Sequence, residues 1–261
     1  MFSNENRCKY LNNQLADVIC QLRFPEILSI NTTIPDKFQD LIRDEFPLYS
    51  ARKEAPAPKI KGGPDGFALE KQAEVINYQF TSADGIWRVN LTSTFISLAC
   101  TKYSCWEDFA AHLDKPLAAF IKLYKPAFFE RVGLRYINLF SRKKLDIEHI
   151  PYSELFSPCY LSVLAQEDVN ENAVSRSNIN VELAIAGGCS VKINTGPAMV
   201  KKNGSNQSEP CFAFDQDLYM RGNVPVTMSA GALQTLHSQA FSIFRGAITD
   251  KMHDALEPTQ I

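Results

Sequence analysis

The chain has 261 residues, enough for one large domain or two small ones. Its composition, with 45% hydrophobic and 21% charged residues, is that of a globular protein. Its net charge of −2 provides no basic excess, so the sequence has no clear nucleic-acid footprint. Seven scattered cysteines, an odd number, favour buried thiols in a reducing compartment over a disulfide framework.

The sequence also gives no sign of a membrane or secreted protein. No apolar run approaches the roughly 20 residues that span a bilayer. Residues 1–9 are polar and lack the apolar core of a signal peptide. We therefore expect a cytoplasmic protein without membrane contact.

The first predicted elements are a strand and a short helix. Residues 18–24 alternate as a pleated strand requires, and Pro25 ends the strand because proline cannot donate to the ladder. Pro35 suits the start of a helix, and apolar residues at spacings of three and four follow it. Residues 50–66 contain four positive charges, three prolines and three glycines without a periodic apolar face, which predicts an exposed loop.

A meander and a long helix follow. The predicted strands are residues 75–82, 86–91 and 95–102, with a hairpin at Asp84-Gly85. Apolar residues at helical spacing predict a helix over Trp106–Tyr124, with a kink at Pro116. Residues Phe129–Phe140 then read as a long, buried strand.

The second half repeats this plan. Its predicted strands are residues 160–166, 180–186, 189–194 and 212–220, with a hairpin at Gly187-Gly188, a polar loop at 195–210 and a helix at 230–256. We predict an α+β fold of antiparallel sheets, each covered by a long amphipathic helix, in two related halves at 1–142 and 143–261.

The segment Arg-Val-Gly-Leu-Arg-Tyr-Ile-Asn at 131–138 is the most informative one. On a strand, Arg131 and Arg135 share one face, and Arg23 and Arg88 also lie on predicted strands. Guanidinium groups bind carboxylates or phosphates through two parallel hydrogen bonds. The candidate ligand-binding residues are Arg23, Arg88, Arg131, Arg135, Asn138 and His237.

His237 lies between Leu233 and Phe241 on the apolar face of the last helix. A histidine in that position is usually a satisfied core residue. The functional alternative is a proton carrier between helix and sheet, because imidazole titrates near neutral pH.

Asp215 and Asp217 are two residues apart on a strand, so both carboxylates project from one face. The favoured interpretation is a structural ion network with the arginines. An anion site formed by the arginines alone is the second. A divalent metal on the two aspartates is the third, because two ligands are few for such an ion.

Other chemistry has little support. No serine-nucleophile elbow, phosphate loop or His-Glu-x-x-His motif occurs. The gap of four residues between Cys100 and Cys105, and the lack of a second pair, argue against a zinc site with His112. We expect no cofactor and lean against an enzyme.

The chain resembles a sporadically distributed bacterial protein family of about 260 residues to which no function is assigned. The motifs that carry the resemblance are residues 20–25, Tyr103-x-x-Trp106-x-x-Phe109, residues 131–138, Asp215-x-Asp217, and His237 with Phe241 and Phe244. The resemblance covers nearly the whole chain and implies no activity, cofactor or catalytic residue. The patchy occurrence of the family resembles that of toxin–antitoxin and phage-defence genes.

Three functional hypotheses follow. The leading one is a non-enzymatic binding protein that acts through a protein partner or a small anionic ligand. The second is a metal-dependent hydrolase or nuclease that uses Asp215 and Asp217. The third is a carrier of an apolar ligand held between a helix and a sheet. The aromatic helices can equally serve a homodimer.

Overall fold

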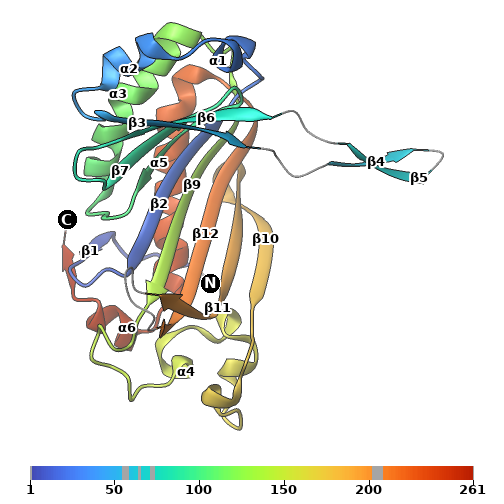
Figure 1. Cartoon of the computed structure of the whole chain (residues 1–261). Helices are drawn as coiled ribbons and strands as arrows, with labels where there is room; N and C mark the ends of the chain where they lie inside the picture. Colours follow the sequence, from blue (N-terminus) through green and yellow to red (C-terminus); the bar gives the residue numbers. More distant parts are fainter. Residues whose placement is uncertain (1, 55–58, 64–65, 71–73, 202–207, 261) are drawn as a thin grey trace.

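The computed structural model describes residues 2–54, 59–63, 66–70, 74–201 and 208–260. The chain has a mixed α+β fold built on an antiparallel sheet of nine strands (Figure 1), as predicted. In spatial order the strands are β10 (Ile179–Ile185), β11 (Cys189–Lys201), β12 (Ser208–Val224), β9 (Phe129–Phe140), β2 (Leu15–Arg23), β8 (Phe95–Cys100), β7 (Trp87–Leu91), β6 (Val75–Thr81) and β3 (Leu48–Glu54).

Two small ribbons accompany this sheet. In one, β1 (Cys8–Tyr10) pairs with β13 (Pro258–Gln260), so the two ends of the chain are joined. In the other, β4 (Lys59–Gly63) pairs with β5 (Gly66–Glu70), apart from the main sheet in Figure 1.

The long helices α3 (Trp106–Tyr124) and α5 (Ser229–Ala247) lie on the same side of the sheet (Figure 1). Helix α5 packs on β9 and β12, and α3 packs on β8. The shorter helices are α1 (Leu28–Thr32), α2 (Asp36–Ile42), α4 (Tyr152–Leu155) and α6 (Asp250–Ala255). Helix α2 packs on α3.

Alternation along β9 decides which side chains face the helices. Val132, Leu134 and Tyr136 are buried on the helix side, whereas Arg131 and Arg135 point to the other side. We call this other side, which includes the outward residues of β2, β9 and β12, the open face. A shift of register by one residue would exchange the two sets, so the buried apolar row fixes the pairing.

One sheet runs through both predicted halves. Strand β9 precedes residue 142 and β12 follows it, yet the two pair antiparallel along most of their length, with Phe214 opposite Asn138 and Asp217 opposite Arg135. The two meanders therefore share one core, and the division at residue 142 stays a prediction about related halves.

Both predicted hairpins are present. Gly85 has φ of 74°, and Gly187 and Gly188 have φ of 75° and 71°, in the left-handed region that glycine tolerates. Helix α3 has the predicted bounds and includes Pro116, and Lys125 in the left-handed conformation ends it.

Two predicted loops contain strands. In the predicted loop at 50–66, β3 and β4 are present, and residues 55–58 and 64–65 lie outside the described residues. Every residue of β3 is exposed, so this edge strand has no apolar alternation to detect. In the predicted loop at 195–210, β11 extends to Lys201 and β12 begins at Ser208, and the two are held together by main-chain pairing. Residues 202–207 are not described.

Two further elements differ from prediction. The predicted strand at 160–166 is a pair of short 3₁₀ turns, because Tyr160, Leu161 and Leu164 are buried at turn spacing instead of alternating. The predicted helix at 230–256 is two helices. Ile248 is extended between them, and the Thr249 hydroxyl accepts a hydrogen bond from the Met252 N–H at the start of α6.

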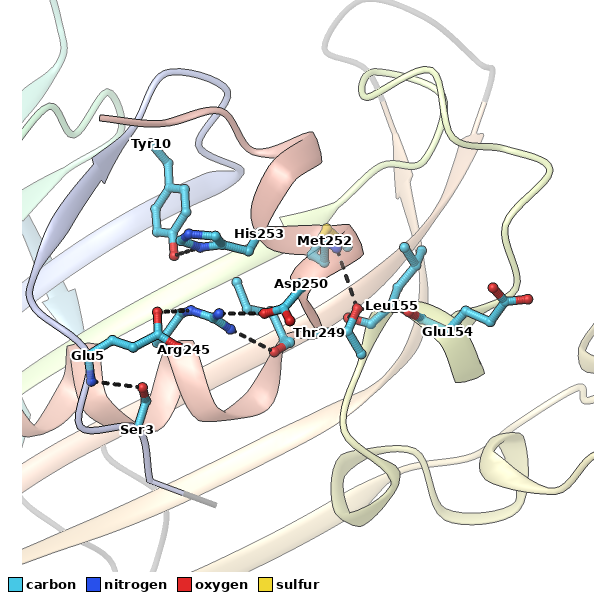
Figure 2. A network of polar contacts seen from close by, with 11 residues as sticks. Ser3, Glu5, Tyr10, Glu154, Leu155, Arg245, Thr249, Asp250, Met252 and His253 are labelled. Carbon is cyan, nitrogen blue, oxygen red and sulfur yellow. Dashed lines mark hydrogen bonds and ion pairs between the residues drawn. The ribbon is translucent and has the colours of Figure 1, made fainter. Parts of the chain in front are cut away.

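Arg245 ties the N-terminal segment to the junction of α5 and α6 (Figure 2). Its guanidinium donates to Glu5 at 2.8 Å, to Asp250 at 2.6 Å and to the Ile248 carbonyl at 3.3 Å. Nearby, the hydroxyl of Tyr10 lies 2.9 Å from Nδ1 of His253. These contacts fix residues 3–10 over the helix side of the sheet.

Candidate functional site

The predicted site residues divide between the two faces of the sheet. Arg131 and Arg135 lie on the open face, and the register of β2, β8 and β7 places Arg23 and Arg88 there too. Asn138 and His237 lie on the helix side, where both are buried. The six residues therefore form two separate groups.

On the open face, the arginines and aspartates form two ion pairs. Nη2 of Arg131 lies 2.5 Å from Oδ1 of Asp217, and Arg135 donates to both carboxylate oxygens of Asp215 at 2.8 and 2.6 Å. The hydrogen bond to Asp215 raises the pKa of the Arg135 guanidinium. The predicted proximity of the two segments is thus present, in the form of an ion network.

Gly133 makes room for this arrangement. A Cβ atom there would lie 2.0 Å from Nη1 of Arg131, so the guanidinium crosses the backbone where a side chain would stand. The same guanidinium lies 4.9 Å from the ring centre of Tyr219. An incoming anion would have to compete with Asp217 and Asp215 for both arginines.

The other two arginines are spread along this face. Arg23 is exposed and opposite Arg131, whereas Arg88 is half-buried two strands from β2. Burial raises the pKa of the Asp17 carboxyl, and Arg88 opposes that rise.

Among the described residues, no group of three or more histidine, cysteine or acidic side chains is placed to hold a metal ion. Asp215 and Asp217 each face an arginine instead. Cys100 is buried on β8, and the His112 ring stacks on Trp87 with ring centres 3.9 Å apart.

A cavity of about 110 Å³ lies on the helix side, bounded by α5, the start of α3, β9, β12 and residues 7–15. Six aromatic side chains are part of its wall: Tyr10, Tyr103, Trp106, Tyr136, Phe241 and Phe244. The N-terminal segment that Arg245 fixes forms one side of it. Helix, sheet and the N-terminal segment thus meet around one hollow, which is partly open to solvent.

His237 is at the centre of the polar contacts in this cavity. Its Nδ1 lies 2.8 Å from the Tyr136 hydroxyl, and its Nε2 lies 2.7 Å from Nη1 of Arg7. Trp106 stacks on the imidazole with ring centres 4.8 Å apart. Arg7 also forms an ion pair with Glu107.

The imidazole of His237 is neutral near pH 7. Burial, with a smaller effect of the Arg7 charge, lowers the pKa of His237 from its usual 6.5 to about 4. Burial also raises the pKa of Tyr136 and of Tyr103 well above the usual value, so both remain protonated phenols.

Two buried amides complete the cavity wall. Gln216 is 2% exposed, and its Nε2 donates to the Ala240 carbonyl at 3.3 Å, while its Oε1 has no partner among the described residues. Asn138 is 3% exposed, and its Nδ2 donates to the Phe214 carbonyl at 3.4 Å. A buried amide oxygen without a partner costs about 1–3 kcal/mol. The oxygen of Gln216 therefore remains unsatisfied in the cavity wall.

Sequence reasoning missed most of this cavity. Arg7 is 230 residues from His237 along the chain, so no motif connects them. A signal existed in β12, where Gln216 interrupts the buried row of Phe212, Phe214 and Leu218. An uncharged amide in such a row indicates a specific polar contact in the core.

Comparison with models of known protein families finds no match for this chain, and no curated protein is significantly similar to it in sequence. The resemblance to the sporadic bacterial family therefore stays a prediction. None of the described helices has the length and apolar character needed to cross a membrane.

Proposed function

We propose that the chain is a non-enzymatic binding protein that holds a small, uncharged aromatic molecule in the cavity beneath α5. One observation carries the proposal: aromatic side chains line the space, and the polar side chains that β9, β12 and α5 contribute to its wall, Tyr136, Asn138, Gln216 and His237, are neutral. Ligand sites are typically apolar hollows with a few placed polar groups.

The volume of the cavity fits about one ring of a ligand. An engineered apolar cavity of about 150 Å³ in another protein binds benzene, and the volume here is about 110 Å³. Small ligands gain between about 0.3 and 1.5 kcal/mol per non-hydrogen atom. A six-atom ring at the middle of that range binds with about −5 kcal/mol, which is a Kd on the order of 0.2 mM.

The charges around the cavity favour a neutral ligand. Arg7 is paired with Glu107, and Lys9 is exposed at the rim. An anion buried among the inner groups would lose its hydration without gaining an unpaired cation. The guanidinium groups of Arg131 and Arg135 are on the opposite face, each bound to an aspartate.

Calorimetric titration with benzene, and with benzoate as the charged counterpart, tests the proposal. We expect saturable binding of benzene and at least tenfold weaker binding of benzoate. Ala240→Val places two methyl groups in the cavity wall and should weaken benzene binding at least tenfold. Ala232→Val, also a buried alanine of α5 but not part of the wall, is the matched control.

The proposal fails if benzene shows no saturable binding to the wild-type protein. It also fails if both valine variants bind benzene as the wild type does, because the ligand would then occupy another place. Tighter binding of benzoate would favour the anionic ligand that the sequence suggested.

Other predictions from the sequence remain predictions. They are the cytoplasmic location, the homodimer, the protein partner and the association with toxin–antitoxin or phage-defence genes. The ion pairs of Asp215 and Asp217 with arginines give the metal-dependent hydrolase no support.

A further inference from the structure

The direction of the hydrogen bonds around His237 is fixed by Arg7. A guanidinium has no acceptor, so Nε2 of His237, 2.7 Å from Nη1 of Arg7, must accept. A neutral imidazole with an accepting Nε2 carries its proton on Nδ1, which therefore donates to the Tyr136 oxygen at 2.8 Å. The phenol of Tyr136 keeps its own proton to donate.

That remaining proton is available at the cavity wall. Tyr136 lines the cavity, and Tyr103 packs edge-on against it with ring centres 5.9 Å apart. Because its oxygen accepts from Nδ1 of His237, the Tyr136 hydroxyl has its O–H left to donate, so this part of the wall calls for a ligand acceptor.

Gln216 provides the complementary group. Its Nε2 donates to the Ala240 carbonyl, which leaves Oε1 without a partner among the described residues. The oxygen is buried, and Gln216 is part of the cavity wall. A ligand N–H that reaches Oε1 would satisfy it while the hydrogen bond from Nε2 is kept.

We infer that the cavity selects a planar ring that carries a carbonyl acceptor next to an N–H donor, as in a lactam or a nucleobase edge. The tyrosine hydroxyl would donate to the ring carbonyl, and Gln216 would accept from the ring N–H. Asn138 lies on the same wall and uses one N–H for the Phe214 carbonyl. Its amide oxygen could accept from the ring N–H, and its second N–H could donate to the ring carbonyl. This inference rests on the proposed function and adds the class of ligand to it.

Binding of four one-ring probes tests the selectivity. 2-Pyridone has the carbonyl and the N–H, N-methyl-2-pyridone lacks the N–H, and benzene lacks both; toluene against benzene measures the steric effect of one methyl group. We expect 2-pyridone to bind on the order of tenfold more tightly than benzene, because benzene leaves the buried acceptor unsatisfied. We expect the same tenfold preference over N-methyl-2-pyridone, once the effect of a methyl group measured with toluene and benzene has been subtracted.

Substitution of the acceptor locates the effect. Gln216→Met keeps the length of the side chain and removes the amide, so it should reduce affinity for 2-pyridone on the order of tenfold more than it changes affinity for benzene. Gln21→Met, on the open face of β2, should change neither.

The outcomes separate the two proposals. If benzene binds but 2-pyridone binds no better, or if Gln216→Met weakens both rings equally, the donor–acceptor selectivity is wrong and the aromatic cavity stands. If neither ring binds to the wild type, both proposals are wrong.

Discussion

Replacement of His237 by glutamine should change how stability depends on pH. Glutamine keeps an acceptor for Arg7 but cannot take up a proton. In the folded protein, burial and then the Arg7 charge lower the pKa of His237 to about 4, against about 6.5 for an exposed histidine. Between these values the unfolded chain binds more protons than the folded one, so stability rises with pH through this window.

The size of the effect follows from those two pKa values. A tenfold difference in proton affinity is worth about 1.4 kcal/mol, and protonation of an unfolded histidine is nearly complete at pH 5. His237 should therefore account for a loss of about 2 kcal/mol in the free energy of unfolding between pH 7 and pH 5. In the His237→Gln variant this part of the loss is absent.

Urea unfolding at pH 7 and pH 5 measures this difference. The readout is the change in the free energy of unfolding between the two pH values, because only this change reports protonation of His237; the absolute stability of the variant also includes other effects of the substitution. His149→Gln removes an exposed histidine and is the matched control. Equal losses of stability on acidification in the wild type and His237→Gln would refute the buried, neutral imidazole.

Three further substitutions test packing and pairing. Arg135→Met leaves the Asp215 carboxylate, which is 14% exposed, without its partner and should lower stability by about 1–2 kcal/mol in thermal melts. The loss is smaller than for a fully buried pair because Arg135 is 44% exposed, and an unchanged Tm would contradict this prediction. Phe109→Ala empties a fully buried site between α3 and the sheet and should cost about 3–5 kcal/mol in urea unfolding, where a loss below 1 kcal/mol would contradict the packing. Thr249→Ala removes the cap of α6 and should cost about 1 kcal/mol, with faster amide exchange confined to Asp250–Ala255; unchanged exchange there refutes the cap.

The sequence predicted those elements whose burial alternates or follows a helical period. Residues 18–24 and Phe129–Phe140 are strands because one face of each is buried, and α3 has an apolar face along its whole length. Strand β3 was missed because main-chain pairing with β6 forms it while all its side chains are exposed. Periodicity detects burial, and an exposed edge strand has none.

The site was predictable only in part, for a similar reason. The proximity of Arg131 and Arg135 to Asp215 and Asp217 was predicted because each pair lies on one face of a strand and the two pairs have opposite charges. The cavity instead depends on Arg7, which contacts His237 from an N-terminal segment held by the pairing of β1 with β13 and by the contact of Arg245 with Glu5. Such contacts between the chain ends leave no local pattern in the sequence.

A crystal soaked with bromobenzene gives the most direct test of the aromatic-ligand cavity, because anomalous scattering locates the bromine independently of the protein atoms. We predict one principal bromine position inside the cavity, against Tyr136 and Phe241, and its loss in Ala240→Val crystals. Bromine bound only at other places on the protein, with this cavity filled by ordered water, would contradict the account.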